Sequence, residues 1–517
     1  GGRAFRIPNS EFRIRTPYDI GRIVNETFLP WLLLIAYAAV IVFLAWRNRR
    51  RSTDIESFSV GSRRVPPFFV GLSLAANMTS VATFVINPGL IHAYGWSGVV
   101  GYGLAAPVGI FIGLVVTSKR FRRVGDKFTV LTVPQWLGER YGDRRLTVFF
   151  ALASMLQISF LVLIVTALVL VLMSVLQIGM WAALLMVVIF TFGYILFGGA
   201  SLHVWSNSVQ ALTMLAVAVI LVFSGAAIFG DGLAGFFGQL DAVAPHYGSM
   251  TNPDSLLFRD LFEVVVANFI IGLAIIMQPH IISKSLYLRS ERDVNTYLVT
   301  AMVAGTIFTS VMLVGLYARI SLGGDLPPDR VVATYIASSF APGLRAFIML
   351  GVLAAGFSTL EGVILALSTI FGNDFYGTLA RARGVNPELL QGQLLRVGRV
   401  FLVVLAPITL FLSYRQIVAP SLSVAIFAQN GVYGLFAATF APVLFGIFSK
   451  RTSAPLAFAA AASALVVHFG MYYGGITQYH NNPAVPAAFA LVISTLVMAV
   501  GVAISKPEEE ENAGNSG

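Results

Sequence analysis

The stretch PPFFVGLSLAANMTSVATFVINPG, from Pro66 to Gly89, decides the fold of this chain of 517 residues. Its length and apolar character suit a helix that crosses a bilayer, because a bilayer core takes about 20 apolar residues in helical form. The centre of the stretch, from Ala75 to Thr83, is instead small and polar. Asparagine and consecutive hydroxyl groups weaken a helix that faces lipid, because each polar group must find a partner. The pattern therefore predicts a membrane helix that is interrupted near its middle.

Apolar runs of similar length recur along the whole chain, of which 57% is hydrophobic and only 11% is charged. A soluble domain averages about 25% charged residues, so lipid must face much of this protein. We expect about thirteen membrane helices, which lie near residues 28–46, 67–91, 97–117, 146–175, 179–198, 204–229, 261–283, 294–319, 343–371, 397–414, 421–448, 454–474 and 484–505. The sequence therefore predicts one all-α polytopic membrane domain over residues 28–505.

Lysine and arginine gather in alternate loops, and this bias sets the orientation of a membrane protein. The N-terminal tail also carries five arginines, which disagree with the orientation that the loops indicate. Residues 1–27 are predicted to form an extracytoplasmic tail, and residues 506–517 a disordered cytoplasmic tail. We expect a multi-pass protein of a plasma membrane, namely a bacterial inner membrane. The loops predicted to be cytoplasmic lie near residues 47–64, 118–145, 284–292, 381–396 and 450–451.

The composition and motifs also exclude several classes of function. The net charge of +10 belongs to loop clusters, so the sequence predicts no nucleic-acid partner. The chain has no cysteine, which excludes a disulfide framework and a cysteine metal site. His280 and His468 have no metal-ligand spacing around them and are interpreted as polar groups with partners. The sequence contains no convincing Ser-His-Asp constellation or phosphate-binding loop, so we do not expect an enzyme.

A second interruption falls in the predicted helix 261–283, at Asn268, Gly272 and Gln278-Pro279-His280. The two interrupted helices lie five helices apart, and an odd offset would invert a second copy of a five-helix unit. The alternative is that both interruptions are the ordinary kinks of a large helical bundle. In the first case the two inverted repeats would be residues 67–229 and 261–448, with peripheral helices at 28–46 and 454–505.

A face of small and hydroxyl side chains lies on the predicted helix 343–371. Ala355, Ser358 and Thr359 are spaced i, i+3 and i+4, so they share one side of that helix. Two hydroxyl oxygens with nearby carbonyl groups suit a hard cation such as Na+. The alternative is that both hydroxyls bond only the carbonyl groups one turn back.

Glu361 is the only carboxylate near the middle of a predicted membrane helix. Carboxylates are costly inside a membrane and are functional candidates for that reason. Three interpretations stay open: a group that takes up a proton, a charge that acts on a nearby cation, or one half of a buried pair.

Five separated motifs extend over the apolar runs. They are SFSVGSRRVPPFFVGLSLAANMTSVATFVINPGLIHAYGWSG (Ser57 to Gly98), FGGASLHVWSNSVQ (Phe197 to Gln210), QPHIISKSLYLRS (Gln278 to Ser290), AAGFSTLEGVILALSTIFGNDFY (Ala354 to Tyr376) and GLFAATFAPVLFGIFSKR (Gly434 to Arg451). In their order, spacing and helical context they resemble the sodium/solute symporter family, whose members carry sugars, proline, pantothenate and monocarboxylates. The resemblance covers roughly residues 28–475.

The resemblance implies an inverted five-plus-five helix fold in which the first helix of each repeat is discontinuous. It also implies a sodium site between the helices 67–91 and 343–371. The implied ligands of Na+ are the backbone oxygens of Ala75, Met78 and Ala355 and the hydroxyls of Ser358 and Thr359.

One departure from the family pattern concerns the start of the sixth helix. Family members often carry a carboxylate there, after a tryptophan and a small hydroxyl residue, whereas this chain has Trp205-Ser206-Asn207. The missing carboxylate argues against a second sodium site, so we expect one sodium ion per transport cycle. Proton coupling stays open, with Glu361 as its candidate.

The solute is expected between the two interruptions, at the middle of the bundle. Ala82 stands where the sugar carriers of the family have a glutamine, which argues against a sugar. A small carboxylate held by helix ends and amides, an amino acid, or a neutral solute all fit. The candidate lining residues are Asn77, Thr79, Ser80, Thr83, Gln157, Asn268, Gln278, Gln429 and Asn430.

The predicted function is sodium-coupled symport, in which a small organic solute enters the cell by alternating access. A proton-coupled carrier of the same fold and a transporter-like solute sensor stay as alternatives. A channel is disfavoured because the chain has neither a repeated filter nor a ring of charge. The expected partners are the solute, Na+ and the bilayer, and no protein partner is predicted.

Overall fold

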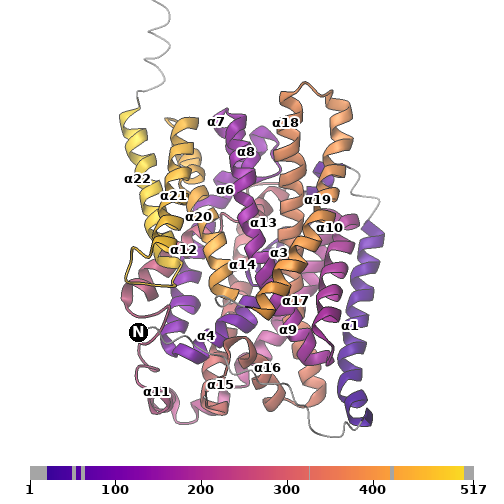
Figure 1. Cartoon of the computed structure of the whole chain (residues 1–517), viewed down its shortest axis with the longest axis vertical. Helices are drawn as coiled ribbons and strands as arrows, with labels where there is room; N and C mark the ends of the chain where they lie inside the picture. The colour runs from indigo at the N-terminus through magenta and orange to yellow at the C-terminus, as the bar shows by residue number, and fades with distance from the viewer. Residues whose placement is uncertain (1–19, 49–53, 60–64, 325, 420–423, 506–517) are drawn as a thin grey trace, which may run out of the picture.

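The computed structural model describes residues 20–48, 54–59, 65–324, 326–419 and 424–505. Throughout these ranges the regular structure is helical, and no β-strand occurs in them. The predicted tail 506–517 and residues 1–19 of the predicted tail 1–27 lie outside the described residues. The helices form one bundle (Figure 1), with α1 (Ile20–Asn48) along one edge and α21 (Ala454–Gly474) and α22 (Ala484–Ile504) along the opposite edge.

Eleven helices of the described residues are long and apolar enough to cross a membrane, and two bent helix pairs raise the number of spans to as many as thirteen. Each span falls on one of the predicted apolar runs, and the bent pairs are the two predicted interruptions. The bent pairs are Pro67–Met78 with Ala82–Tyr94 and Phe262–Ile275 with Pro279–Tyr287. The eleven helices are Thr27–Arg47, Trp96–Phe128, Arg144–Leu176, Met180–Ala200, Leu202–Phe223, Asp293–Leu322, Pro342–Ala382, Pro387–Val418, Val424–Phe448, Ala454–Gly474 and Ala484–Ile504.

The first break separates α3 (Pro67–Met78) from a second segment that runs from Ala82 through α4 (Asn87–Tyr94). Thr79 leaves the helical conformation, with φ −104° and ψ 84°, and the two segments meet at 54°. The Ser80 hydroxyl accepts a hydrogen bond from the amide of Ala82 (3.1 Å), so a side chain satisfies a free amide at the start of the second segment. The small and hydroxyl residues thus form the predicted break.

The second break lies between α12 (Asn268–Ile275) and α13 (Pro279–Ile282). Proline lacks an amide hydrogen, and the residue before a proline avoids the helical conformation. Gln278 accordingly has φ −58° and ψ 127°, and the two segments meet at 57°. A proline therefore causes this break, whereas polar and hydroxyl residues accompany the first one. The interruption that the sequence also predicted at Asn268 and Gly272 is wrong, because both residues lie within α12.

Contacts between the two predicted repeats occur in matched pairs. α3 packs along α14 (Asp293–Ser310), and α12 packs along α6 (Ala106–Phe128). In the first pair, the first span of one repeat contacts the second span of the other repeat. The second pair makes the same contact with the two repeats exchanged. A Cβ added to Gly71 of α3 would lie 2.6 Å from a carbonyl oxygen of α14, and one added to Gly272 of α12 would lie less than 3.0 Å from a carbonyl oxygen of α6. Glycine therefore permits the close approach of both helix pairs.

α10 (Met180–Phe223) contains two spans, because it is interrupted at Gly199, where φ is 58° and ψ is −165°. Residues other than glycine rarely adopt this conformation. The second of these spans begins at Leu202, so the Trp205-Ser206-Asn207 motif lies in its first turns.

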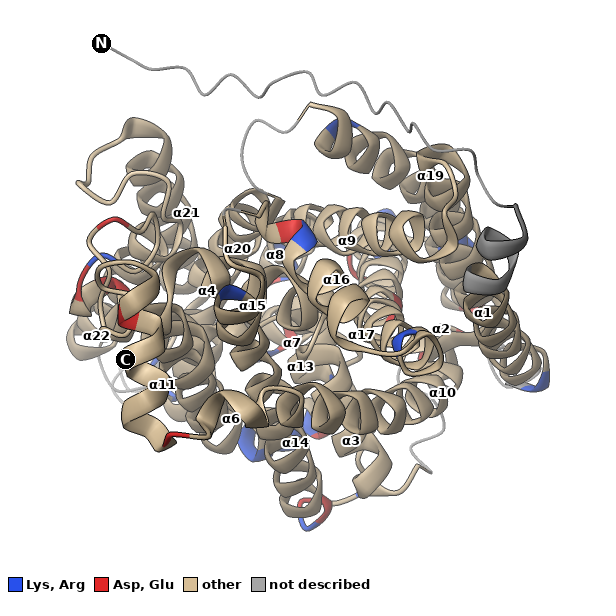
Figure 2. Cartoon of the chain, turned by 90° about the horizontal axis from the view of Figure 1, so that it is seen from below, with Lys and Arg blue, Asp and Glu red and all other residues tan. Residues whose placement is uncertain are grey.

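α17 (Pro342–Thr369) is the central helix of the bundle, since 94% of the apolar window of its span is buried, against 11% for α1. Seen from below, charged residues occupy only short segments of the ribbon (Figure 2). The other long helices are α9 (Ile158–Leu176), α19 (Pro387–Val418) and α20 (Val424–Phe448). The shorter ones are α2 (Ile55–Ser59), α7 (Val133–Tyr141), α8 (Arg144–Ala153), α11 (Gly232–Val243), α15 (Val314–Leu322), α16 (Pro328–Ser339) and α18 (Gly377–Ala382).

Candidate functional site

The break at the end of α3 faces the hydroxyl side of α17. The Ser358 hydroxyl lies 3.1 Å from the carbonyl oxygen of Ala76, and the Thr359 hydroxyl lies 3.2 Å from the carbonyl oxygen of Asn77. Both hydroxyl side chains are fully buried. The fold therefore brings together the two elements to which the resemblance assigns a sodium site.

The same hydroxyls also reach back along their own helix. Ser358 lies 3.0 Å and Thr359 lies 3.3 Å from the carbonyl oxygen of Ala355. A hydroxyl has one hydrogen and two lone pairs, so it can donate to one carbonyl oxygen while a lone pair contacts a cation. The two hydroxyls therefore contact the carbonyl group one turn back in α17 and the carbonyl groups of α3 at the same time.

The end of α3 has the electrostatic character that a cation requires. The last carbonyl groups of a helix have no partner within it, and the helix dipole is negative at this end. The Ala75 carbonyl accepts a bond from the amide of Thr79 (3.0 Å), and Met78 is half-buried beside the break. Oxygen ligands of this kind suit a hard monovalent cation. No group of three or more His, Cys, Asp or Glu side chains in the described ranges could hold a metal ion.

A cavity of about 160 Å³ adjoins the break. Of the described residues that line it, none is an Asp, Glu, Lys, Arg or His. The buried Oε1 of Gln278 has no hydrogen-bond partner among the described residues, so an N–H or O–H group of a bound solute could satisfy it. Seven of the nine predicted lining residues border the cavity: Asn77, Thr79, Ser80, Thr83, Asn268, Gln278 and Gln429.

The other two predicted lining residues, Gln157 and Asn430, are not among the residues that border this cavity. The side-chain amide of Gln157 pairs with Nδ1 of His280 (3.1 Å), and that of Asn430 donates to the hydroxyl of Tyr473 (3.0 Å). Nε2 of His468 donates to the carbonyl oxygen of Asn430 (2.8 Å). Both histidines thus have polar partners, as their surroundings in the sequence predict.

Glu361 is fully buried in the middle of α17 and is surrounded by hydrogen-bond donors. The Ser206 hydroxyl (2.6 Å) and the Gln210 amide (2.9 Å) donate to its carboxylate, as does the Tyr194 hydroxyl. Nδ1 of His203 lies 3.4 Å from the carboxylate. Of the three interpretations that the sequence left open, this geometry favours membership in a buried pair or network.

Lys284 belongs to the same network, and its position corrects the sequence interpretation. The charge pattern places Lys284 in a cytoplasmic loop, which is wrong: the side chain is 1% exposed, within the turn Ser283–Tyr287 that follows α13. Its ammonium group lies 3.3 Å from Nε2 of His203 and contacts the Ser73 hydroxyl of α3. The assignment of Lys284 to a loop failed because the seventh span continues to residue 287. One feature of the sequence could have revealed this position: Lys284 follows Pro279 by only a few residues, so the helix after the break is still inside the span.

Asn207 occupies the position at which the family pattern often has a carboxylate. Its side-chain amide donates to the side-chain oxygen of Asn77 and lies 3.4 Å from the carbonyl oxygen of Ser358. The neighbouring Ser206 bonds Glu361. The carboxylate of this region therefore comes from α17 and not from the start of the sixth span.

A bundle of membrane helices with two broken spans, a buried cluster of oxygens and an adjoining cavity is typical of secondary transporters. The Sodium:solute symporter family model matches residues 58–463, and the chain belongs to this family. The resemblance that the five motifs indicate is thereby confirmed.

Relatives of the chain include sodium symporters. The sodium/pantothenate symporter of Escherichia coli (strain K12) is 24% identical over 501 residues, which cover 92% of this chain and 96% of that protein. The sodium/proline symporter of Haemophilus influenzae is 22% identical over 491 residues, with 89% and 91% covered. A solved structure of a Na+-coupled sialic acid symporter has a TM-score of 0.78 at 16% identity, covering 93% of this chain and 99% of that one.

These likenesses confirm the predicted fold class and make the chain a multi-pass membrane protein of a sodium-coupled symporter family. The predicted orientation of its termini stays a prediction.

Proposed function

We propose that this chain imports a small organic solute together with one Na+ held between α3 and α17. The observation that carries the proposal is the contact of Ser358 and Thr359 with the last carbonyl oxygens of α3, directly beside the cavity. The proposed ligands of Na+ are the backbone oxygens of Ala75, Met78 and Ala355 and the hydroxyls of Ser358 and Thr359.

Asn77 links the proposed ion site to the cavity. Its carbonyl oxygen contacts Thr359, and its side chain borders the cavity. Binding of Na+ would hold the end of α3 against α17 and would thereby fix the Asn77 side chain for the solute. By linkage, the solute would raise the affinity for Na+ by the same factor. Opening of the bundle to the cytoplasm, where Na+ is scarce, would then release both.

A small carboxylate or an amino acid is the proposed class of solute. The cavity is polar at the break of α3 and aromatic elsewhere, where Phe111, Phe160 and Tyr433 line it. Because none of the described residues that line it is charged, helix ends and amides would have to bind the charges of the solute. Pantothenate and proline, which the named relatives carry, are the first solutes to test.

Uptake into proteoliposomes tests the proposed function. We expect an inward Na+ gradient to drive accumulation of labelled solute above its equilibrium level, and an inward K+ gradient to drive none. A thermal-shift screen of small carboxylates, amino acids and sugars, in NaCl and in KCl, selects the solute if pantothenate and proline are inactive. Accumulation driven by a proton gradient without Na+ would favour the proton-coupled alternative. Binding of a solute without accumulation would favour the sensor.

A further inference from the structure

Lys284 connects both broken spans. It lies in the turn that ends the second half of the seventh span, and its ammonium group contacts Ser73 in the first half of the second span. The ammonium group also lies 3.3 Å from Nε2 of His203, near the start of the sixth span. Because the side chain is 1% exposed, bulk water does not hydrate this charge.

The ring of His203 connects this ammonium group to Glu361. Nε2 of His203 lies 3.2 Å from the side-chain nitrogen of Asn77. An amide nitrogen and an ammonium group can only donate, so their positions assign Nε2 as the accepting nitrogen. The hydrogen then resides on Nδ1, which lies 3.4 Å from the carboxylate. The hydrogen bonds therefore run in one direction, from ammonium through imidazole to carboxylate.

The other donors to Glu361 do not balance its charge. The hydroxyls of Tyr194 and Ser206 and the amide of Gln210 are neutral groups. A carboxylate that is buried away from water keeps its negative charge only where a cation compensates it. The cationic member of this network is Lys284, which reaches the carboxylate through a single side chain.

We propose that Lys284 is a tethered counter-cation of Glu361, and that it takes the place which a second cation from solution would otherwise occupy at this carboxylate. The protein then draws one cation from solution in each cycle, the Na+ at Ser358 and Thr359. Lys284 thus determines the ion stoichiometry. Only that count of one rests on the proposed function, because the pairing of Lys284 with Glu361 is independent of the sodium site.

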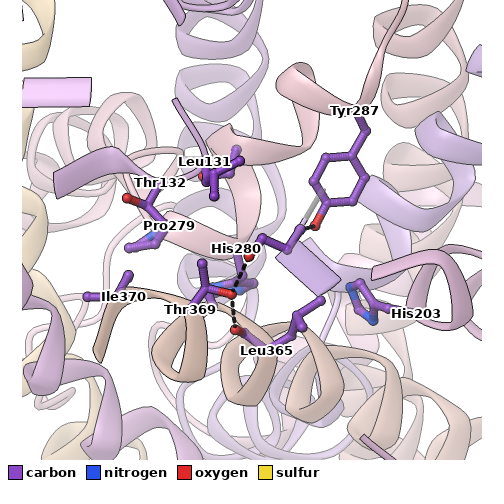
Figure 3. A pocket seen from close by; sticks show the side chains of 13 residues that line it. Leu131, Thr132, His203, Pro279, His280, Tyr287, Leu365, Thr369 and Ile370 are labelled. Carbon is purple, nitrogen blue, oxygen red and sulfur yellow. Dashed lines mark hydrogen bonds between the residues drawn. The ribbon is translucent and has the colours of Figure 1, made fainter. Parts of the chain in front are cut away.

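A small cavity lies beside His203, the ring that separates the ammonium group from Glu361. The cavity holds about 20 Å³, and His203, His280, Thr132, Thr369 and Tyr287 are among its lining residues. Figure 3 shows the His203 ring at one side of this space and Thr132 at the other. Its volume suits about one water molecule. Removing the lysine side chain would free its own volume beside the same ring, whose Nδ1 faces Glu361.

Equilibrium binding of radioactive sodium to the purified full-length protein tests this inference. We expect one Na+ per chain for the unaltered protein, about two for Lys284→Ala, and one for the double variant Lys284→Ala/Glu361→Gln. Lys284→Arg keeps the charge and should match the unaltered protein. Equal counts for the unaltered protein and Lys284→Ala would overturn the inference. Failure of the unaltered protein to bind Na+ would overturn the proposed sodium site instead, because the inference concerns the difference between the two counts.

The Glu361→Gln variant keeps the inference testable if Lys284→Ala does not fold. Removing the carboxylate leaves the ammonium group uncompensated near Asn77, so repulsion should lower the affinity for Na+ by at least about tenfold. The double variant Lys284→Met/Glu361→Gln removes that charge and should restore the affinity. Unchanged affinity in Glu361→Gln, or a further loss in the double variant, would overturn the inference, since a purely structural role predicts that further loss.

Discussion

Gly362 of α17 lies directly against the side chain of Asn77 at the break of α3. A Cβ at position 362 would be less than 3.0 Å from the side-chain nitrogen of Asn77, closer than real Cβ atoms approach. Asn77 itself bonds Asn207 and His203, and its carbonyl oxygen contacts Thr359. One asparagine therefore joins the cavity, the proposed sodium site and the buried network, and a glycine makes room for it.

Replacing Gly362 with alanine should uncouple these three regions. The added Cβ displaces the Asn77 side chain at a cost of about 1–3 kcal/mol. Since about 1.4 kcal/mol amounts to a factor of ten, we expect sodium-driven uptake to fall by about tenfold or more. The matched control is Gly193→Ala in α10, where an added Cβ would meet none of the described residues within 4 Å. Uptake and sodium dependence measured in proteoliposomes distinguish the two variants. Native-like uptake by Gly362→Ala would contradict the role assigned to Asn77.

Removing either hydroxyl of the proposed sodium site should weaken the binding of both Na+ and solute. For Ser358→Ala and for Thr359→Ala we expect the sodium concentration at half-maximal uptake to rise by about tenfold, because a buried oxygen ligand is lost. Linkage requires the solute affinity measured in Na+ to fall as well. Thr439→Ala is the control, because Thr439 is equally buried and its hydroxyl donates to the carbonyl one turn back, at Leu435 (2.7 Å). Unchanged sodium dependence in both site variants would refute the assignment.

The sequence reveals the features whose causes are local. The polar run around Thr79 and the proline at position 279 each interrupt a helix through their own backbone chemistry, so both breaks could be predicted. The hydroxyl face of Ser358 and Thr359 follows from the 3.6-residue period of a single helix. Predictions of this kind need no knowledge of which helices are neighbours.

The buried network could not be predicted, because its members are distant in the sequence. His203 lies 81 residues from Lys284 and 158 residues from Glu361. No periodic pattern specifies such pairs, and a lysine between apolar runs is ordinarily a loop residue. Gln429 and Asn430 illustrate the same limit at short range. Adjacent helical residues point about 100° apart, so a neighbour of a lining residue need not face the cavity.

The adjacent pair Gln429 and Asn430 provides a test of the substrate cavity. Gln429 borders the cavity and donates to Tyr102 (3.2 Å), whereas Asn430 is engaged with Tyr473. We expect Gln429→Ala to lower solute affinity by about tenfold, the scale of a lost buried hydrogen bond. Sodium binding without solute should not change. We expect Asn430→Ala to leave solute affinity within about twofold of the native value. Equal losses in both variants, measured by thermal shift against the identified solute, would mean that the solute occupies a different space.

The close approach of α12 and α6 should contribute to the stability of the protein, which can be measured as its melting temperature. An added Cβ on Gly272 would lie less than 3.0 Å from the carbonyl oxygen of Ala106, and one on Gly109 would lie less than 3.0 Å from that of Phe269. Overpacking of this kind costs about 1–3 kcal/mol, so Gly272→Ala and Gly109→Ala should each lower the melting temperature in detergent by several degrees. Gly392→Ala in α19, where an added Cβ meets no atom of the described part of the chain within 4 Å, should not change the melting temperature.

The double variant Gly109→Ala/Gly272→Ala distinguishes damage to one shared helix interface from two independent local defects. Either alanine alone would push the same two helices apart, so the second substitution should add less than its own single effect. Fully additive losses would mean that each glycine is needed for a local reason within its own helix. The matched packing of the two repeats would then lose its support at this interface.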